Sequence, residues 1–512
     1  MLTHETMLAA GARSYPHRLA LRDGVGREVA FGELHDQVSA VASALLEHGA
    51  RPGECVAWLS RNRIDYLVAF YAAARAGLLF SPINYWLREP EIRPLLKLLR
   101  PTMVICEAEF RDIMDVTTAG SEVRTRVILD ADAADGWVTW QDLIKAGMDD
   151  ARSLPSGDEN APHEIIFTSG TTGEQKAVLR SQRSRLMDSF MGALGFGLSR
   201  NDHLLWFLPQ FHVGGAGTTN MLLSQGGCVT VMREFDERLA ARQIGNGVTC
   251  ISGVPTTFNL LCDSGELKGV DTSGVRACFV GGSLADRSIF DKISLHFPSA
   301  EMVQCYGSTE SGPHSVTIRG RALAERPDSV GLPGAGCEAR VVRVDGTDAD
   351  PEEVGELWLR SEAVMAGYFR RDDLTANALT PDRWLRTGDL VKRDKDGYLY
   401  VMDRLVDKII TGGENVYSKE VEDVLLAHNL VAEVAVIGIR DPAREERIVA
   451  YIRTEPGAQL GAEELAAFAR ARLAGYKVPT EFHFADDLPR TPIGKVSKVL
   501  LKVRYHTETA GT

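Results

Sequence analysis

The sequence predicts the α/β fold class: a large N-terminal domain of doubly wound α/β subdomains plus a β-rich subdomain, and a small C-terminal α+β domain. Three observations support this prediction. Short apolar runs alternate with segments of helical periodicity in the first part of the chain, residues 355–404 alternate between apolar and polar side chains, and the pattern changes again after Arg404. Repeated β–α alternation is typical of mostly parallel sheets, and strict alternation is typical of antiparallel strands.

The elements of the N-terminal domain follow from local patterns. Apolar residues recur at helical spacing over 34–45, and Gly49 follows as the expected end of that helix. Three short apolar runs are expected to be buried strands: CVAWL (55–59), EIIFT (164–168) and CVTVM (228–232). The longer run LVAFYAAARAGLLF (67–80) contains Arg75 and is too short to span a bilayer, so we expect a buried helix there.

The last part of the chain is expected to form a separate domain. Antiparallel strands over 355–404 lead into a glycine loop, ITGGENVYS (410–418). The expected elements after this loop are a helix with Val421, Val424 and Leu425 on one face, strands at 434–439 and 447–453, a helix with Leu465, Phe468 and Leu473, and a basic tail at 489–502. We therefore expect domains spanning residues 1–403 and 404–512.

Composition and charge exclude several classes of function. The 512-residue chain is 44% hydrophobic and 25% charged, as is typical of globular proteins. Its net charge of −13, from 57 Lys+Arg and 70 Asp+Glu, argues against nucleic acid as a partner. The eight cysteines include no Cys-x-x-Cys pair, and residues 1–18 lack the apolar core of a signal peptide. We expect a cytoplasmic protein with free thiols, no zinc and no membrane span.

A segment rich in glycine and hydroxyl groups, TSGTTGEQK (168–176), begins where the strand expected at 164–168 ends. Glycines let backbone N–H groups turn toward an anion, hydroxyls add donors, and Lys176 adds a positive charge. The segment lacks the Gly-Lys-Ser/Thr ending of a Walker P-loop. Because a strand, this loop and a lysine follow one another, we favour a phosphate loop of another kind over a solvated connection between strands.

This segment resembles the phosphate loop of the adenylate-forming superfamily, which includes acyl-CoA synthetases, peptide-synthetase adenylation domains and luciferases. Other segments resemble the further motifs of that superfamily in the same order: LPQFHVGG (208–215), VGGSL (280–284), QCYGSTES (304–311), RTGDL (386–390), DRLVDKIITGGENVY (403–417) and PRTPIGKVSK (489–498). The resemblance covers most of the chain. It implies that the small C-terminal domain is mobile about a hinge near residues 403–406.

The resemblance also implies the site residues. The catalytic residues would be Lys495, Thr309 and Glu310, with Glu310 holding Mg²⁺. ATP or AMP would be bound by Thr168, Ser169, Gly170, Thr171, Thr172, Gly173, Lys176, Gly281, Gly282, Ser283, Gln304, Tyr306, Gly307, Ser308, Asp389 and Arg404. The acyl pocket would contain His212, Val213, Gly214, Cys305 and Gly312, and CoA would meet Gly412, Gly413 and Lys477. For Lys477 and Lys495 the alternative is a plain surface lysine.

The implied activity is that of an acyl-CoA synthetase, an ATP-dependent acid–thiol ligase. A carboxylate attacks the α-phosphorus of ATP and pyrophosphate leaves; CoA then displaces AMP from the acyl-AMP. The carboxylate is already ionised near neutral pH, so the first step needs positioning and charge neutralisation and no general base. Mg²⁺ suits this task because it takes carboxylate and phosphate oxygens. The alternative acceptor is the phosphopantetheine of a carrier protein.

The substrate is less well defined by the sequence. His212 stands where amino-acid-activating relatives often carry an Asp, which disfavours an α-amino acid, although His212 could instead be a core histidine. Glycines at 214, 281, 307 and 312 leave room for a bulky apolar acid, unless they serve backbone turns. A luciferase-like oxygenase and a non-catalytic relative are disfavoured. Val406 departs from the Asp or Lys that is usual at the hinge, and homo-oligomerisation is left open.

Overall fold

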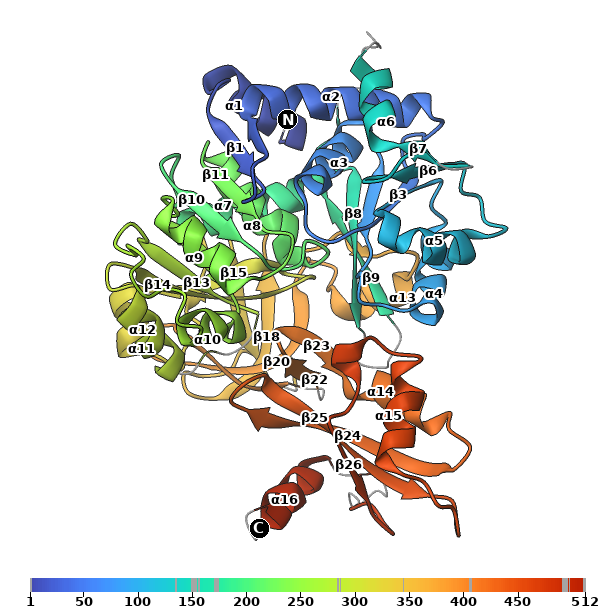
Figure 1. Cartoon of the computed structure of the whole chain (residues 1–512). Coiled ribbons are helices and arrows are strands. Elements are labelled where there is room, and N and C mark those ends of the chain that lie inside the picture. The colour runs from blue at the N-terminus through green and yellow to red at the C-terminus, as the bar shows by residue number, and fades with distance from the viewer. Residues whose placement is uncertain are drawn as a thin grey trace. The chain divides into compact units, whose positions relative to one another are not determined.

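The computed structural model describes residues 2–133, 136–148, 154, 157–169, 175–282, 285, 287–343, 345–404, 408–489, 496 and 498–509. The chain forms two compact units, each described here by itself (Figure 1). Unit 1 comprises Met1–Tyr85, Leu96–Phe167 and Ala177–Asp403, and unit 2 comprises Trp86–Leu95, Thr168–Lys176 and Arg404–Thr512. Within the part of the chain that the structure describes, no helix combines the length and the apolar character needed to cross a membrane.

One large sheet of unit 1 carries two of the segments with predicted nucleotide residues, around Gly281 and Tyr306. Its strand order is β16-β15-β14-β13-β12-β10-β11-β1-β2. The strands are β1 (Leu19–Arg22), β2 (Glu28–Ala30), β10 (His203–Trp206), β11 (Cys228–Val231), β12 (Cys250–Gly253), β13 (Ala277–Val280), β14 (Glu301–Ser308), β15 (Gly312–Arg319) and β16 (Leu332–Pro333). The run from β1 to β14 is parallel, whereas β2, β15 and β16 pair antiparallel.

A second large sheet has the order β19-β9-β8-β4-β3-β5-β6-β7. Its strands are β3 (Cys55–Leu59), β4 (Leu79–Pro82), β5 (Met103–Cys106), β6 (Thr125–Ile128), β7 (Val138–Thr139), β8 (Pro162–Ser169), β9 (Gln175–Ser181) and β19 (Gly367–Tyr368). The pairs from β7 to β8 are parallel, and β19 pairs antiparallel with β9. Strands such as β3 and β5 are buried along their whole length, as expected where helices cover both faces of a parallel sheet.

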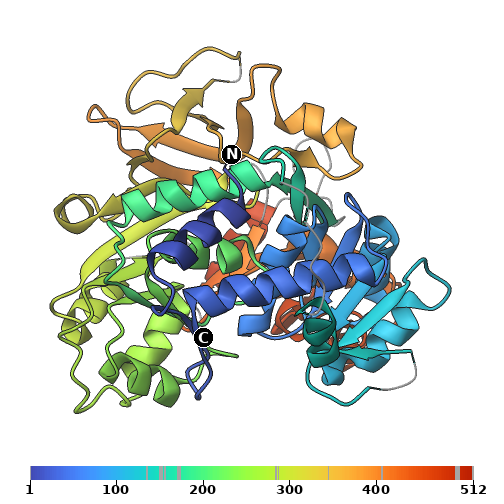
Figure 2. The ribbon, with the colours of Figure 1, turned by 90° about the horizontal axis from the view of Figure 1, so that it is seen from above.

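The helices of this part are α1 (His4–Ser14), α2 (Phe31–Glu47), α3 (Ile64–Arg75), α5 (Arg111–Thr118), α6 (Trp140–Met148), α7 (Gln182–Gly195), α8 (Val213–Ser224), α9 (Glu237–Gly245), α10 (Pro255–Asp263), α11 (Arg287–His296), α12 (Gly320–Glu325) and α13 (Asp372–Ala378). Helix α4 (Glu89–Leu99) begins in the segment assigned to unit 2 and ends in unit 1. The long helix α2 is the blue helix that crosses the middle of Figure 2. Its Leu34, Val38 and Val41 belong to one hydrophobic core with Trp58 and Trp206. The predicted mixed α/β class is confirmed.

The β-rich part of unit 1 is an antiparallel sheet of order β17-β18-β20-β21. Its strands are β17 (Glu338–Val342), β18 (Val354–Arg360), β20 (Leu385–Arg393) and β21 (Leu399–Arg404). Along β18, Leu357 and Leu359 are buried while Trp358 and Arg360 are partly exposed. This alternation is the pattern from which the strands over 355–404 were predicted. The prediction is confirmed for β18, β20 and β21, but the range also contains helix α13, and β19 belongs to the second large sheet.

Unit 2 is built around a mostly antiparallel sheet with helices. The sheet has the order β23-β22-β25-β24, and β26 pairs in parallel with β25. Its elements are β22 (Lys408–Thr411), β23 (Glu414–Tyr417), β24 (Val431–Asp441), β25 (Glu445–Thr454), β26 (Glu481–Phe484), α14 (Ser418–Leu426), α15 (Ala462–Arg470) and α16 (Lys498–Thr509). The two predicted helices and the strands at 434–439 and 447–453 are confirmed, with the difference that α15 ends at Arg470 and leaves Leu473 outside the helix.

Three predicted elements differ from the structure. The run 67–80 is not one helix, because α3 ends at Arg75, Gly77 takes a φ of 71° and β4 follows. The segment 410–418 is not a simple loop, because it contains the β22–β23 hairpin, which turns at Gly412 and Gly413 with φ of 58° and 76°. The basic tail at 489–502 runs into helix α16.

Candidate active site

The predicted nucleotide residues Tyr306 and Asp389 lie together in unit 1. Tyr306 lies near the end of β14, and Asp389 lies on β20 of the β-rich sheet. The Tyr306 hydroxyl donates a 2.5 Å hydrogen bond to Asp389 Oδ2. Asp389 is itself 5% exposed, and its backbone N–H donates to Thr387 Oγ1 at 3.1 Å. The aromatic ring and the carboxylate that the resemblance assigns to adenine and ribose are thus held at one place.

The turn between β14 and β15 carries Thr309 and Glu310. The backbone N–H groups of Ser308 and Ser311 each donate to the hydroxyl of the other residue, at 2.9 and 3.1 Å. The Glu310 carbonyl accepts from the Met365 N–H at 2.8 Å, and Glu310 Oε1 accepts from the Tyr368 hydroxyl at 2.9 Å. The turn is therefore fixed both by its own serines and by a segment far away in the sequence.

Gln304, also predicted to meet the nucleotide, is 2% exposed on β14. Its side-chain Oε1 has no hydrogen-bond partner among the residues that the structure describes. A buried acceptor without a donor is costly in a folded protein. Such an atom is chemically suited to accept a hydrogen bond from the amino group of a bound adenine.

The structure explains most of the predicted pocket glycines by the fold itself. A Cβ at Gly307 would lie 2.1 Å from the Gly312 carbonyl oxygen, and one at Gly281 would lie 2.7 Å from Cys305 Sγ. Gly312 has a φ of 91°, which few side chains tolerate. Only Gly214, of these four, would place a Cβ at ordinary contact distance, 3.5 Å from the Trp206 ring. Three of the four are therefore weak indications of a large acyl group.

His212 caps the N-terminus of α8, directly before Val213 and Gly214. Its ring lies 4.4 Å from the Phe211 ring, measured between centroids. His212 is half-buried, and whether it serves the acyl pocket or is a core histidine stays a prediction. The predicted acyl residue Cys305 lies on β14, where burial raises the pKa of its thiol to about 12.

In unit 2, the predicted CoA residue Lys477 is buried, with 2% of its surface exposed. Its ammonium donates to Glu420 Oε1 at 2.6 Å and to Glu91 Oε1 at 3.2 Å. Burial alone would lower the pKa of Lys477, but the two carboxylates raise it above its ordinary value. The alternative of a plain surface lysine is wrong.

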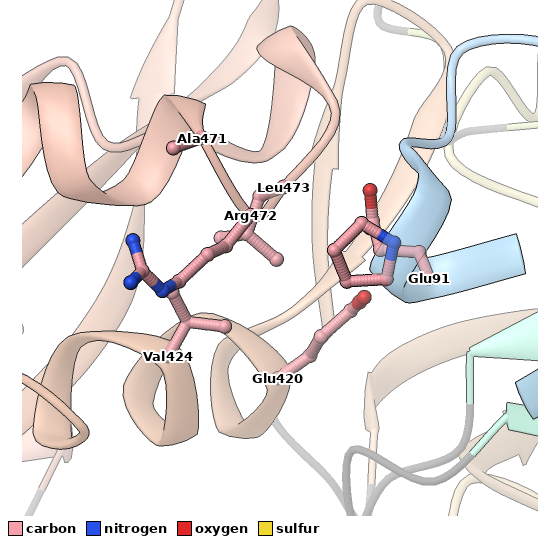
Figure 3. Close-up of a pocket in the computed structure, with 7 residues that line it drawn as sticks. Glu91, Glu420, Val424, Ala471, Arg472 and Leu473 are labelled. Carbon is pink, nitrogen blue, oxygen red and sulfur yellow. The ribbon is translucent and has the colours of Figure 1, made fainter. Parts of the chain in front are cut away.

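A pocket of about 510 Å³ lies beside this ion cluster in unit 2 (Figure 3). It is lined by Pro90, Glu91, Glu420, Val424, Ala471, Arg472 and Leu473. Burial raises the pKa of Glu91 above that of an ordinary carboxyl group, although Lys477 opposes the change. Glu91 and Glu420 therefore face both this pocket and Lys477.

Several predicted site residues lie outside the described part of the chain. They are Gly170, Thr171, Thr172, Gly173, Ser283 and Lys495, and the residue Val406 of the predicted hinge also lies outside it. The strands that flank the phosphate loop are described, so Thr168 is placed near the end of β8 and Lys176 near the start of β9. Arg404 ends β21, and Gly412 and Gly413 form the turn between β22 and β23. The roles of these residues stay predictions.

Sequence reasoning missed Arg180 and Tyr368, which both bind the Thr309–Glu310 turn. Arg180 lies on β9 and is fully buried, and its Nη1 donates to the Thr309 carbonyl at 3.2 Å. One signal could have revealed Arg180: it lies two residues after Val178 on the same buried face of an apolar strand. For Tyr368 we find no comparable local signal.

Comparison with known proteins identifies the family of the chain. The family profile of the AMP-binding enzyme matches residues 8–369, and that of the AMP-binding enzyme C-terminal domain matches residues 420–495. The chain is 33% identical to the indoleacetate–CoA ligase of Aromatoleum aromaticum, over 92% of each chain. It is 32% identical to the feruloyl-CoA synthase of an Amycolatopsis species, over 96% of this chain and 97% of that one.

Among solved structures, the chain is similar to the amide bond synthetase McbA of Marinactinospora thermotolerans, with a TM-score of 0.89 and 26% identity. That match covers 98% of this chain and 99% of the other. With the Tyr306–Asp389 pair and the Thr309–Glu310 turn in place, the chain belongs to the adenylate-forming superfamily of AMP-binding enzymes and is an AMP-forming acid–CoA ligase.

Proposed function

We propose that the enzyme activates a bulky aromatic carboxylic acid and transfers the acyl group to free CoA in the cytoplasm. The observation that carries this proposal is the 33% identity, over 92% of both chains, to a ligase named for indoleacetate. A second relative of similar identity is named for ferulate, which is also an aryl-substituted acid. A Cβ at Gly214 would lie at ordinary contact distance from the Trp206 ring, and this position is compatible with an aromatic acyl group.

In the proposed first step, a carboxylate oxygen attacks the α-phosphorus of ATP, a P–O bond forms, and pyrophosphate leaves. Tyr306 would stack on adenine, Gln304 Oε1 would accept from its amino group, and Asp389 would accept from the ribose hydroxyls. Thr309 would donate to the α-phosphate, and Lys495 would bridge that phosphate and the carboxylate. Together these residues would position the reacting groups and neutralise charge, which are the main requirements of the reaction.

Glu310 fits a Mg²⁺ ion that arrives with ATP. The described residues contain no group of three or more His, Cys, Asp or Glu side chains arranged to hold a metal. Mg²⁺ is commonly held by one or two carboxylates together with substrate phosphates and water. Glu310, with its carboxylate oriented through Oε1 by Tyr368, could serve as such a ligand. Bound there, the ion would neutralise charge on the phosphates.

In the proposed second step, the thiolate of CoA attacks the acyl carbonyl carbon and AMP leaves with the electron pair of the C–O bond. Gly412 and Gly413 would line the path of the pantetheine arm. For Lys477 to bind CoA, a phosphate of CoA would have to compete with Glu91 and Glu420 for the Lys477 ammonium. The free state of all eight cysteines is compatible with a reducing compartment.

The decisive experiment is acid-dependent ATP–pyrophosphate exchange over a panel containing indole-3-acetate, ferulate, benzoate, acetate and phenylalanine. We expect an aryl-substituted acid to give the highest kcat/KM, and mass spectrometry to detect its CoA thioester. The highest kcat/KM for acetate or phenylalanine would contradict the proposed substrate class.

The same reactions should be repeated with a phosphopantetheinyl carrier protein or with a primary amine in place of CoA. Transfer to the carrier with none to CoA would establish the alternative acceptor. Amide formation with none to CoA would instead match the named activity of the structurally similar synthetase.

A further inference from the structure

A buried arginine contacts the catalytic turn from inside unit 1. Arg180 is fully buried on β9. Its Nη1 donates to the Thr309 carbonyl at 3.2 Å, and its Nη2 donates to the carbonyls of Ala363 at 2.7 Å and Ser184 at 3.2 Å. A charged guanidinium is costly to bury unless its donors are used. Arg180 uses Nη1 and Nη2 on backbone carbonyls: those of Thr309 and Ala363 are far away in sequence, and that of Ser184 is four residues away. Its Nε has no hydrogen-bond partner among the described residues.

Tyr368 contacts the same turn through the side chain of Glu310. Its hydroxyl donates to Glu310 Oε1 at 2.9 Å, and its ring is 7% exposed. Tyr368 lies on β19, which pairs with β9 in the register Tyr368 opposite Val178. The backbone segment that contains Ala363, Met365 and Tyr368 therefore binds Arg180, the Glu310 carbonyl and the Glu310 carboxylate.

The charge of Arg180 persists in this buried position. Burial lowers its pKa to about 10, and the neighbouring Arg185 acts in the same direction, while Asp188, Glu164 and Glu310 oppose the change. At neutral pH the guanidinium is therefore protonated and keeps all its donors. The Arg180 guanidinium is therefore a positive charge next to Thr309 and Glu310 in the protein without nucleotide.

We propose that Arg180 and Tyr368 are positioning residues for adenylation, which fix the Thr309 backbone and the Glu310 carboxylate in the geometry that the Mg²⁺ complex of ATP requires. The inference rests on the proposed roles of Thr309 and Glu310. Preorganised groups stabilise a transition state because they need not reorient during the reaction. In this proposal both residues act through Thr309 and Glu310, which they contact directly.

The structure offers a matched control in Arg185 on α7. Arg185 is also fully buried, and its Nη2 donates to the buried carboxylate of Glu164 at 3.0 Å. No hydrogen bond within the described residues joins Arg185 to the Thr309–Glu310 turn. An Arg185→Met variant therefore removes a buried charge of the same kind without removing the contact under test.

The experiment compares Arg180→Met, Arg180→Lys, Tyr368→Phe and Arg185→Met with the wild-type chain. Three quantities are measured: pyrophosphate exchange, thioester formation from synthetic acyl-AMP and CoA, and the affinity for α,β-methylene-ATP with and without Mg²⁺ by calorimetry. Unfolding by urea shows which variants are folded.

We expect Arg180→Met and Tyr368→Phe to lower exchange about tenfold to hundredfold, the range that small misplacements of catalytic groups produce. Both should reduce the gain in nucleotide affinity that Mg²⁺ provides, and Arg180→Lys should recover part of it. Thioester formation from synthetic acyl-AMP should stay within about twofold of wild type, because that step needs no Mg²⁺ complex of ATP. Arg185→Met, provided that urea unfolding shows it to be folded, should keep the Mg²⁺ effect.

Equal losses in both half-reactions, or the same loss of the Mg²⁺ effect in Arg185→Met, would overturn the inference. If Arg180→Met fails to fold, Arg180→Lys still tests the contact of the guanidinium with Thr309. Tyr368→Phe tests the contact with Glu310, since it removes a single oxygen atom. Failure of the proposed function would look different, because the wild-type chain would then show no exchange with any aryl acid. The calorimetric comparison would still decide the inference in that case.

Discussion

The hydrogen bond between Tyr306 and Asp389 allows the nucleotide site to be tested by removing one oxygen atom. Tyr306→Phe keeps the ring but leaves Asp389 Oδ2 without this donor. A hydrogen bond to a charged group contributes about 1.5 kcal/mol or more, so we expect about a tenfold rise in the KM for ATP. Tyr400→Phe is the control, because its hydroxyl binds Asp394 at 3.1 Å outside the site. Equal effects of both variants would contradict the assignment.

Lys477 allows a second test with single residues. Lys477→Met would leave Glu91 and Glu420 without the cation that both contact. Breaking a buried ion pair in this way costs about 3–5 kcal/mol, and we expect a loss of that order in the free energy of unfolding. The double variant Lys477→Met/Glu420→Gln should recover part of it, because one charge disappears. Unchanged stability together with a raised KM for CoA would instead assign the ammonium to CoA.

At the scale of single residues, the resemblance predicted which residues form the site but not the contacts that fix their positions. Tyr306 and Asp389 were each assigned to the nucleotide, and their direct contact agrees with that assignment without testing it. Arg180 and Tyr368 were not predicted, because the residues that they contact are far away in the sequence. Arg180 contacts Thr309, more than a hundred positions away, and Tyr368 contacts Glu310, more than fifty positions away. Such contacts depend on which strands become neighbours, and local patterns do not specify that.

At the scale of elements, the β22–β23 hairpin turns on Gly412 and Gly413. Both have positive φ, and a Cβ on Gly412 would meet no atom within 4 Å. Gly412→Ala should therefore destabilise unit 2 through backbone strain alone, by about 1 kcal/mol. Gly412→Asn should cost less, because Asn tolerates this conformation. Urea unfolding measures both changes.

Gly475→Ala is the control for the hairpin. A Cβ at Gly475 also meets nothing within 4 Å, and Gly475 is not among the glycines of positive φ. Its substitution should leave stability nearly unchanged. If Gly412→Ala were as harmless as Gly475→Ala, the positive φ of Gly412 would not be required for the hairpin.

The elements that were predicted wrongly share a physical cause. The run 67–80 is apolar except for Arg75, and buried helices and buried strands can have the same composition. Gly77, which follows α3, was the usable signal, because glycine commonly ends a helix. The Gly412–Gly413 pair between residues that can form strands was likewise a hairpin signal. The strand at 55–59 was predicted correctly because it is short and bounded by turns.

At the scale of the whole molecule, the proposed reaction divides the work between adenylation and thioester formation. Adenylation brings two anions together, the carboxylate and the α-phosphate, and needs a cation between them. In thioester formation, the CoA thiolate instead attacks the acyl carbonyl carbon and the acyl–AMP bond breaks. Lys495 is proposed for the first task and the Gly412–Gly413 turn for the second, with the chain hinging near Arg404 and Val406 between the two.

Lys495→Ala should therefore separate the half-reactions. A lost transition-state charge contact commonly costs ~2.7–4 kcal/mol, or ~10²–10³ in rate, and pyrophosphate exchange should fall by that factor. The same variant, given synthetic acyl-AMP and CoA, should form thioester at close to the wild-type rate. A companion change, Val406→Pro, restricts φ at the proposed hinge and should slow the coupled reaction more than either isolated step. Equal losses in both half-reactions of Lys495→Ala would mean that this lysine serves the fold, or that one arrangement of the chain performs both steps.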